Sequence, residues 1–104
     1  MISRINITAS QRATEAWGQQ LPNVFALVKD RITDRCPASF TAQAPQLTIL
    51  VDVDETIGAQ GFRIAEQESG VVALTSDSII GITAGFGKLL RTSDYSADGF
   101  KLSS

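Results

Sequence analysis

The alternation of apolar and polar residues predicts four short strands. Gln46–Asp54 gives the clearest pattern, with apolar residues at 47, 49, 51 and 53 on one face. Shorter alternations precede and follow it, and Glu68-Ser69-Gly70 is typical of a hairpin turn between the last two strands. The expected strands cover residues 3–8, 46–54, 61–67 and 71–75.

Two longer segments carry apolar residues at helical spacing. The first runs from about Ser10 to Asp34, and Gly18 and Pro22 interrupt it, so a kink or two consecutive helices are expected. Its buried stripe comprises Trp17, Leu21, Val24, Phe25, Val28 and Ile32. The second begins after a cap at 76, 77 or 78 and ends near Arg91. Its inner face comprises Ile79, Ile82, Thr83, Phe86, Leu89 and Leu90.

This order of elements predicts a two-layer α+β sandwich. Two main helices on one face of a mixed sheet of about four to five strands would bury both apolar stripes. A right-handed crossover makes the first two strands parallel. Residues 36–45 are expected to be a loop, and residues 99–102 could add a strand. The shared core is expected to contain Phe62, Ile64, Phe86 and Leu90.

Composition excludes several kinds of chemistry. The 104 residues suit one domain, and without histidine no Ser-His-Asp triad can form. A single cysteine, Cys36, cannot form an internal disulfide or a zinc site of several thiolates. The net charge of −2 and the lack of a basic stripe argue against nucleic-acid binding. No apolar run is long enough to span a bilayer. Acid–base chemistry would rest on carboxylates, lysines or Tyr95.

Two short motifs suggest phosphate chemistry. Asp52-Val53-Asp54-Glu55-Thr56 follows an apolar strand and resembles the first motif of haloacid-dehalogenase-type phosphatases, in which two Asp residues act near Mg²⁺. The later acidic pair of that family is missing. Gly81–Lys88 is similar to a phosphate loop, but Ile82 and Leu89 occupy positions where the motif needs Gly and Ser or Thr. Close packing of the helix explains these glycines better.

Residues 46–95 as a unit resemble the N-terminal accessory domain of large glycoside hydrolases. Alpha-glucuronidases, beta-hexosaminidases and alpha-N-acetylglucosaminidases carry such a domain before their catalytic barrel. Gln60-Gly61-Phe62-Arg63-Ile64 is similar to the family's strand, which usually has Glu in place of Gln60. The family's helix pattern is matched by Gly81, Gly85, Leu89, Leu90 and Arg91, with Ala84 where an aromatic residue is usual.

The resemblance implies a non-catalytic domain that packs beside a (β/α)₈ barrel in glycan degradation. Residues 1–104 would then be one accessory domain, excised from a larger multidomain enzyme whose barrel holds the catalytic carboxylates. No cofactor is implied, the partner is the barrel, and a glycan could lie nearby. The compartment would be periplasmic or secreted if the parent carries a signal peptide, and otherwise cytoplasmic. A surface for the barrel is expected on the free sheet face or at Tyr95, Phe100 and Leu102.

Two other functions remain open at this point. The chain could be a small phosphatase-like enzyme that uses Asp52 and Asp54 with Mg²⁺. It could also be a carbohydrate-binding module, which would need exposed aromatic residues in a row. The chain has seven aromatic residues, and several of them fall at expected core positions.

Overall fold

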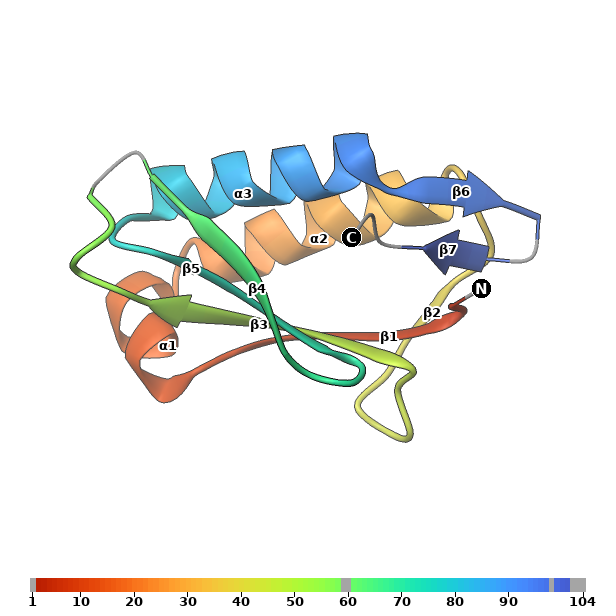
Figure 1. Ribbon diagram of the computed structural model, residues 1–104, viewed down its shortest axis with the longest axis horizontal. Coiled ribbons are helices and arrows are strands. Elements are labelled where there is room, and N and C mark those ends of the chain that lie inside the picture. Colours follow the sequence, from red (N-terminus) through yellow and green to blue (C-terminus); the bar gives the residue numbers. More distant parts are fainter. Residues whose placement is uncertain (1, 59–60, 98, 102–104) are drawn as a thin grey trace.

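The computed structural model describes residues 2–58, 61–97 and 99–101. Within these residues the chain forms three helices, a five-stranded mixed sheet and a small two-stranded hairpin, which confirms the expected α+β class (Figure 1). The elements in chain order are β1 (Arg4–Ala9), α1 (Gln11–Trp17), α2 (Leu21–Thr33), β2 (Ser39–Phe40), β3 (Leu47–Val53), β4 (Arg63–Glu68), β5 (Val71–Ser76), α3 (Ile79–Thr92), β6 (Asp94–Ser96) and β7 (Gly99–Lys101).

The sheet has the strand order β2-β1-β3-β5-β4. Its first four strands are parallel, and only β4 at the edge runs antiparallel to its neighbour β5. The expected parallel pairing of the first two long strands is confirmed, since Ile7 of β1 lies beside Ile49 of β3. The turn from β4 to β5 contains Gly70 at φ 82°, a conformation that glycine adopts readily.

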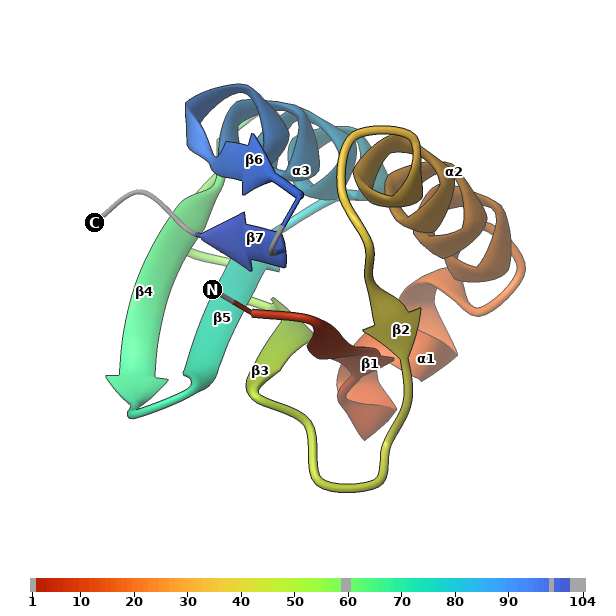
Figure 2. The ribbon, with the colours of Figure 1, turned by 90° about the vertical axis from the view of Figure 1, so that its right-hand side faces the viewer.

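The helices α2 and α3 lie side by side over the same face of the sheet, as expected (Figure 2). Inward-facing residues of the sheet, such as Ile49 and Leu74, form one core with the inner faces of these helices. Phe25 of α2 and Phe86 of α3 meet edge to face, with ring centroids 6.2 Å apart. Ala13 and Trp17 place α1 in the same core, which gives Trp17 the structural role expected for it.

The helix boundaries follow the local signals in the sequence. Ser10 caps α1 and Ser78 caps α3, each accepting a hydrogen bond from a backbone N–H of the first turn. The long helical pattern is divided after Trp17, and Pro22 lies in the first turn of α2, where a missing N–H does no harm. Of the two expected outcomes, a kink or two consecutive helices, the structure has the second.

Two sequence-based expectations were wrong, those for residues 36–45 and for Ile64, and the strand expected near the end of the chain is present. The segment expected to be a loop contains β2, a strand too short to produce a recognisable pattern. The last strand, which residues 99–102 were expected to add, is confirmed as β7 (Gly99–Lys101), and it pairs with β6 in a hairpin separate from the main sheet. Ile64 does not belong to the core, because β4 is an edge strand whose six residues are all exposed and α3 lies over β5. The side chain of Ile64 is 37% exposed.

Candidate functional site

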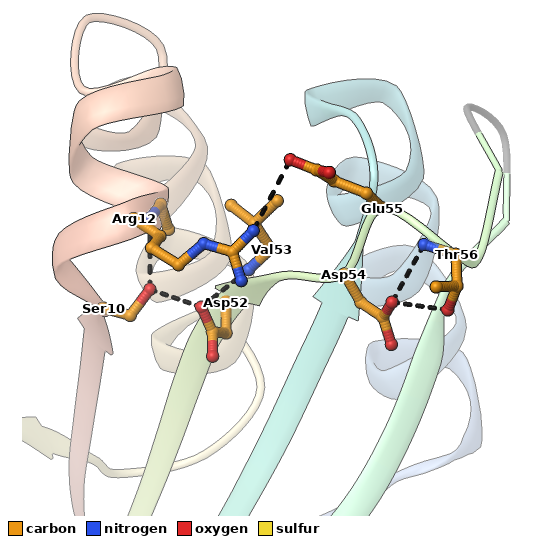
Figure 3. A network of polar contacts seen from close by, with 8 residues as sticks. Ser10, Arg12, Asp52, Val53, Asp54, Glu55 and Thr56 are labelled. Atoms are coloured by element: carbon orange, nitrogen blue, oxygen red, sulfur yellow. Dashed lines mark hydrogen bonds and ion pairs between the residues drawn. The ribbon is translucent and has the colours of Figure 1, made fainter.

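Ser10, Asp52 and Asp54 lie at the carboxyl ends of two neighbouring parallel strands (Figure 3). Asp52 and Asp54 belong to the phosphatase-like motif, and Ser10 comes from the end of the strand beside it. This edge is where open α/β sheets usually bind ligands. Ser10 follows β1, and Asp52 and Asp54 lie at and just beyond the end of β3. The hydrogen bonds of the two carboxylates decide what this edge can do.

Asp52 holds the first turn of α1 in place. Its Oδ1 accepts hydrogen bonds from the Ser10 hydroxyl at 2.6 Å and from the N–H of Val53 at 2.8 Å. The Ser10 Oγ in turn accepts a hydrogen bond from the N–H of Ala13 at 3.1 Å. The side chain of Asp52 therefore links the end of β3 to the helix cap, a structural role.

Asp54 closes a turn with Thr56. Its Oδ1 accepts hydrogen bonds from the Thr56 hydroxyl at 2.6 Å and the Thr56 N–H at 3.0 Å. These two bonds, the hydroxyl first, hold the pKa of Asp54 below its ordinary value, with a small contribution from Arg63, 3.9 Å away. In Figure 3 the carboxylates of Asp52 and Asp54 are directed toward these separate partners.

The remaining charges at this edge form an exposed ion pair. Arg12 of α1 lies 3.5 Å from Glu55, and both side chains are largely solvated, so the pair adds little stability. In the part of the chain that the structure describes, no group of three or more His, Cys, Asp or Glu side chains could hold a metal ion. The magnesium site of the phosphatase hypothesis thus finds no ligand set in the described residues.

The glycines of the glycoside-hydrolase pattern meet at one junction between α3 and the sheet. A Cβ at Gly81 would collide with the Ser76 Oγ and the backbone oxygen of Gly61. One turn later, a Cβ at Gly85 would collide with Leu74 and press on the Phe62 ring at 3.3 Å. Close packing therefore requires both helical glycines, as expected.

Ser76 links these glycines, and the sequence-based reasoning considered it only as one of three possible helix caps. It is fully buried, and its hydroxyl donates a hydrogen bond of 2.5 Å to the backbone oxygen of Gly61. Its Oγ also accepts a hydrogen bond from the N–H of Ser78 at 3.3 Å. A serine at the end of an apolar strand, five residues before a helical glycine, was the only available signal.

The other pattern residues divide between core and surface. Leu89 and Leu90 are buried, Phe62 packs against the core, and Arg91 is exposed. Gln60, which precedes the first pattern glycine, lies outside the described residues.

The C-terminal hairpin differs from the interdomain surface expected there. Phe100 is fully buried, because β7 folds back beside Ile2 and the Phe100 ring joins the core. Tyr95 packs against Phe100, with ring centroids 5.5 Å apart, and its hydroxyl donates a hydrogen bond to the backbone oxygen of Leu90. Phe100 is thus unavailable to a partner, and Leu102 lies outside the described residues.

The free face of the sheet remains as a candidate surface. Thr8, Leu50, Ala73 and Ala65 form a row across four strands of this face. Leu50 and its neighbour Thr48 are half-buried, and Leu50 does not belong to the core. None of the described helices covers this face (Figures 1 and 2).

No family model matches the chain, and a search of curated proteins found no match. None of the helices in the described ranges is long and apolar enough to cross a membrane.

Proposed function

We propose that the chain is a non-catalytic N-terminal accessory domain of a glycan-degrading enzyme, which packs beside a (β/α)₈ catalytic barrel. The observation that carries this proposal is the uncovered face of a mainly parallel sheet. Parallel sheets occur almost always with both faces covered. Here α2 and α3 cover one face, and the row of residues through Leu50 lies on the other.

The character of this face suits a partner within the same chain. Its central residues are small, β-branched or aliphatic, as in Thr8, Thr48, Leu50 and Thr75. Interfaces between domains of one chain are more polar than obligate protein–protein interfaces. A mixed face of this kind can therefore dock on a barrel and still tolerate water when the domain is alone.

The glycine junction supports the resemblance on which the glycan-degrading role depends. Gly81 and Gly85 permit one close contact between α3 and the sheet, and Gly61 contributes its backbone oxygen to that contact, although a Cβ on Gly61 would face Ile57 instead. Because these residues of the pattern take part in one packing arrangement, the pattern supports a fold shared with the accessory domain more strongly than unrelated glycines would.

The alternative functions receive less support from the geometry. Asp52 and Asp54 hold a helix cap and a turn, and the described residues supply no metal ligand set. All seven aromatic residues are buried or packed against the core, whereas a carbohydrate-binding module needs exposed rings in a row.

The test uses the parent gene. The coding sequence beyond residue 104 is read, and the full-length protein is expressed with and without residues 1–104. We expect a glycoside-hydrolase barrel whose thermal stability and soluble yield fall when the domain is removed. A following sequence without a barrel, or a barrel equally stable and active alone, would overturn the proposal.

A matched pair of variants locates the contact surface. Leu50→Arg places a charge on the free sheet face, and Ala84→Arg places the same charge on the exposed surface of α3. Leu50→Arg should lower the stability of the full-length protein and leave the isolated domain folded, and Ala84→Arg should change neither. Equal behaviour of the two variants in the full-length protein would exclude this face as the contact.

The isolated domain gives a second, independent readout. It should hydrolyse no aryl glycoside, and with Mg²⁺ it should release phosphate from an aryl phosphate no faster than buffer does. Turnover of the phosphate that Asp52→Asn abolishes would favour the phosphatase-like function instead.

A further inference from the structure

A groove of about 260 Å³ lies between α2 and α3 and is lined by residues of both helices. Apolar side chains form much of its lining, among them Leu27, Val28, Phe86 and Leu90. Leu27 is 50% exposed, whereas Val28, Phe86 and Leu90 are buried, so Leu27 offers more accessible apolar surface than these three residues. The groove is independent of the sheet face proposed to contact a barrel.

Three arginines, and no carboxylate, line the same groove. They are Arg31 and Arg35 at the end of α2 and just beyond it, and Arg91 in the last turn of α3. No salt bridge joins any of them to a carboxylate within the described part of the chain. The lining of the groove itself is therefore positively charged, although Asp30 and Asp34 alternate with Arg31 and Arg35 along the chain.

One of these guanidinium groups, that of Arg35, is held in place by a ring contact, and that of Arg91 lies close to Gly87. Arg35 lies over the Tyr95 ring, 5.2 Å from its centroid. The Nη1 of Arg91 lies 3.2 Å from the position that a Cβ on Gly87 would occupy, so Arg91 folds back over the glycine. Guanidinium groups that are already positioned lose less freedom when they bind a carboxylate.

Gly87 itself supports the presence of a binding site. A glycine inside a helix costs about 1 kcal/mol relative to alanine. Packing against the sheet accounts for Gly81 and Gly85, but the atom that a Cβ on Gly87 would meet is the flexible end of Arg91. Gly87 lines the groove, and its missing side chain leaves room there for the end of Arg91.

We propose that this groove binds a small carboxylate with a single aliphatic chain of medium length. The aliphatic chain would lie along Leu27, Val28 and Phe86, and the carboxylate would accept hydrogen bonds from the arginines at the end of the groove. The volume lies just below the usual range for ligand pockets, about 300–1,000 Å³, which favours a short chain over a large ligand.

The test is an NMR titration of the ¹⁵N-labelled chain with sodium octanoate. Backbone amide shifts should saturate and be largest at Leu27, Gly87 and Leu90. Octyltrimethylammonium, which has the same chain length and the opposite charge, should bind far more weakly. Equal binding of both probes, no saturable shifts with octanoate, or shifts centred on the sheet face would overturn the proposal.

Variants of α3 separate binding from folding. Gly87→Leu fills the groove and should weaken octanoate binding at least roughly tenfold, whereas Ala84→Leu adds the same side chain at an exposed position outside the lining and should not. Leucine favours a helix over glycine, so Gly87→Leu should remain folded. Unchanged binding by Gly87→Leu would contradict the proposal.

The arginines have a simpler possible role, since positive charge in the last turn of a helix stabilises its dipole. Arg91→Gln should weaken octanoate binding roughly tenfold, the effect of losing a hydrogen bond to a charged group. Lys88→Gln removes the same charge outside the lining and should bind normally. If both variants bind octanoate equally well, the arginines only stabilise the helix dipoles, and the proposed carboxylate site is refuted.

A second copy of the chain is the other occupant that the experiment detects. If the groove amides shift with protein concentration alone, and Gly87→Leu abolishes self-association in sedimentation velocity, the groove is a dimer surface. That result would also overturn the proposal of a carboxylate ligand.

Discussion

Gly81→Ala tests whether α3 can approach the sheet only through glycine. The new Cβ would collide with the Ser76 Oγ and the backbone oxygen of Gly61, and it would lie 2.9 Å from the Ser76 Cβ. Neither the backbone of Gly61 nor the buried side chain of Ser76 can move away without breaking their hydrogen bond. The helix must therefore shift outward, or the hydroxyl must lose its acceptor.

The expected change in the free energy of unfolding combines two destabilising effects and one stabilising effect. Overpacking costs about 1–3 kcal/mol. Loss of the Ser76–Gly61 hydrogen bond costs about 0.5–1.5 kcal/mol. The higher helix propensity of alanine returns about 1 kcal/mol. The free energy of unfolding should thus fall by about 2 kcal/mol, which lowers the Tm of a domain this size by roughly 8–16 °C.

Gly87→Ala is the matched control, because it makes the same change six residues along the same helix. Its Cβ would meet only the end of a flexible arginine side chain, so helix propensity dominates and stability should rise by about 0.5–1 kcal/mol. Urea denaturation followed by circular dichroism measures both variants. If Gly81→Ala is as stable as Gly87→Ala, close approach does not explain the glycine.

A double-mutant cycle identifies the atom responsible. In a Ser76→Ala background the nearest side-chain oxygen is gone, so Gly81→Ala should cost less than it does in the natural sequence. An unchanged cost would place the collision on the Gly61 backbone alone.

Three further predictions concern residues outside this junction. Phe100→Ala should lower the free energy of unfolding by about 3–5 kcal/mol because the ring is fully buried, whereas Ile64→Thr on the exposed edge should change it by less than about 0.5 kcal/mol in the same urea assay. Asp54 should titrate below its ordinary pKa in ¹³C NMR. The ionised carboxylate therefore stabilises the fold above the pKa of Asp54 in the unfolded chain, and this stabilisation is lost as the pH falls through its pKa in the folded chain. Thr56→Val should raise the folded-state pKa of Asp54 and make the loss of stability at low pH smaller. Burial raises the pKa of the Cys36 thiol, so at pH 8 Ellman's reagent should react with the folded chain far more slowly than with the chain in urea.

The sequence predicted those parts of the fold in which one face of an element is buried along its whole length. The strand pattern of β3 and the helical pattern of α3 are of this kind, because each apolar position meets the same core. The prediction that Ile64 is buried was wrong, because alternation shows which face of the sheet a residue is on but not whether a helix covers that face. Phe100 was expected on the surface and is buried, because a single aromatic residue in a polar segment has no periodicity from which its burial could be predicted.

The candidate sites were less accessible to sequence reasoning than the fold. Asp52 and Asp54 matched a catalytic motif, but their bonds to Ser10 and Thr56 depend on how β3 ends beside α1. The groove needs two helices that lie far apart in the sequence, so the pattern of neither helix could reveal it. Its lining combines residues of the expected buried stripes, such as Val28 and Phe86, with exposed residues such as Leu27.

The bridge between Ile2 and Phe100 determines how the domain would bear tension. The two residues exchange a pair of backbone hydrogen bonds, each 2.8 Å long, so the segment before β1 is joined directly to β7. A pulling force applied through both ends would load these two bonds before it reached the parallel strands. The β6–β7 hairpin and the Phe100 ring would detach first, while the five-stranded sheet and its helices stayed folded.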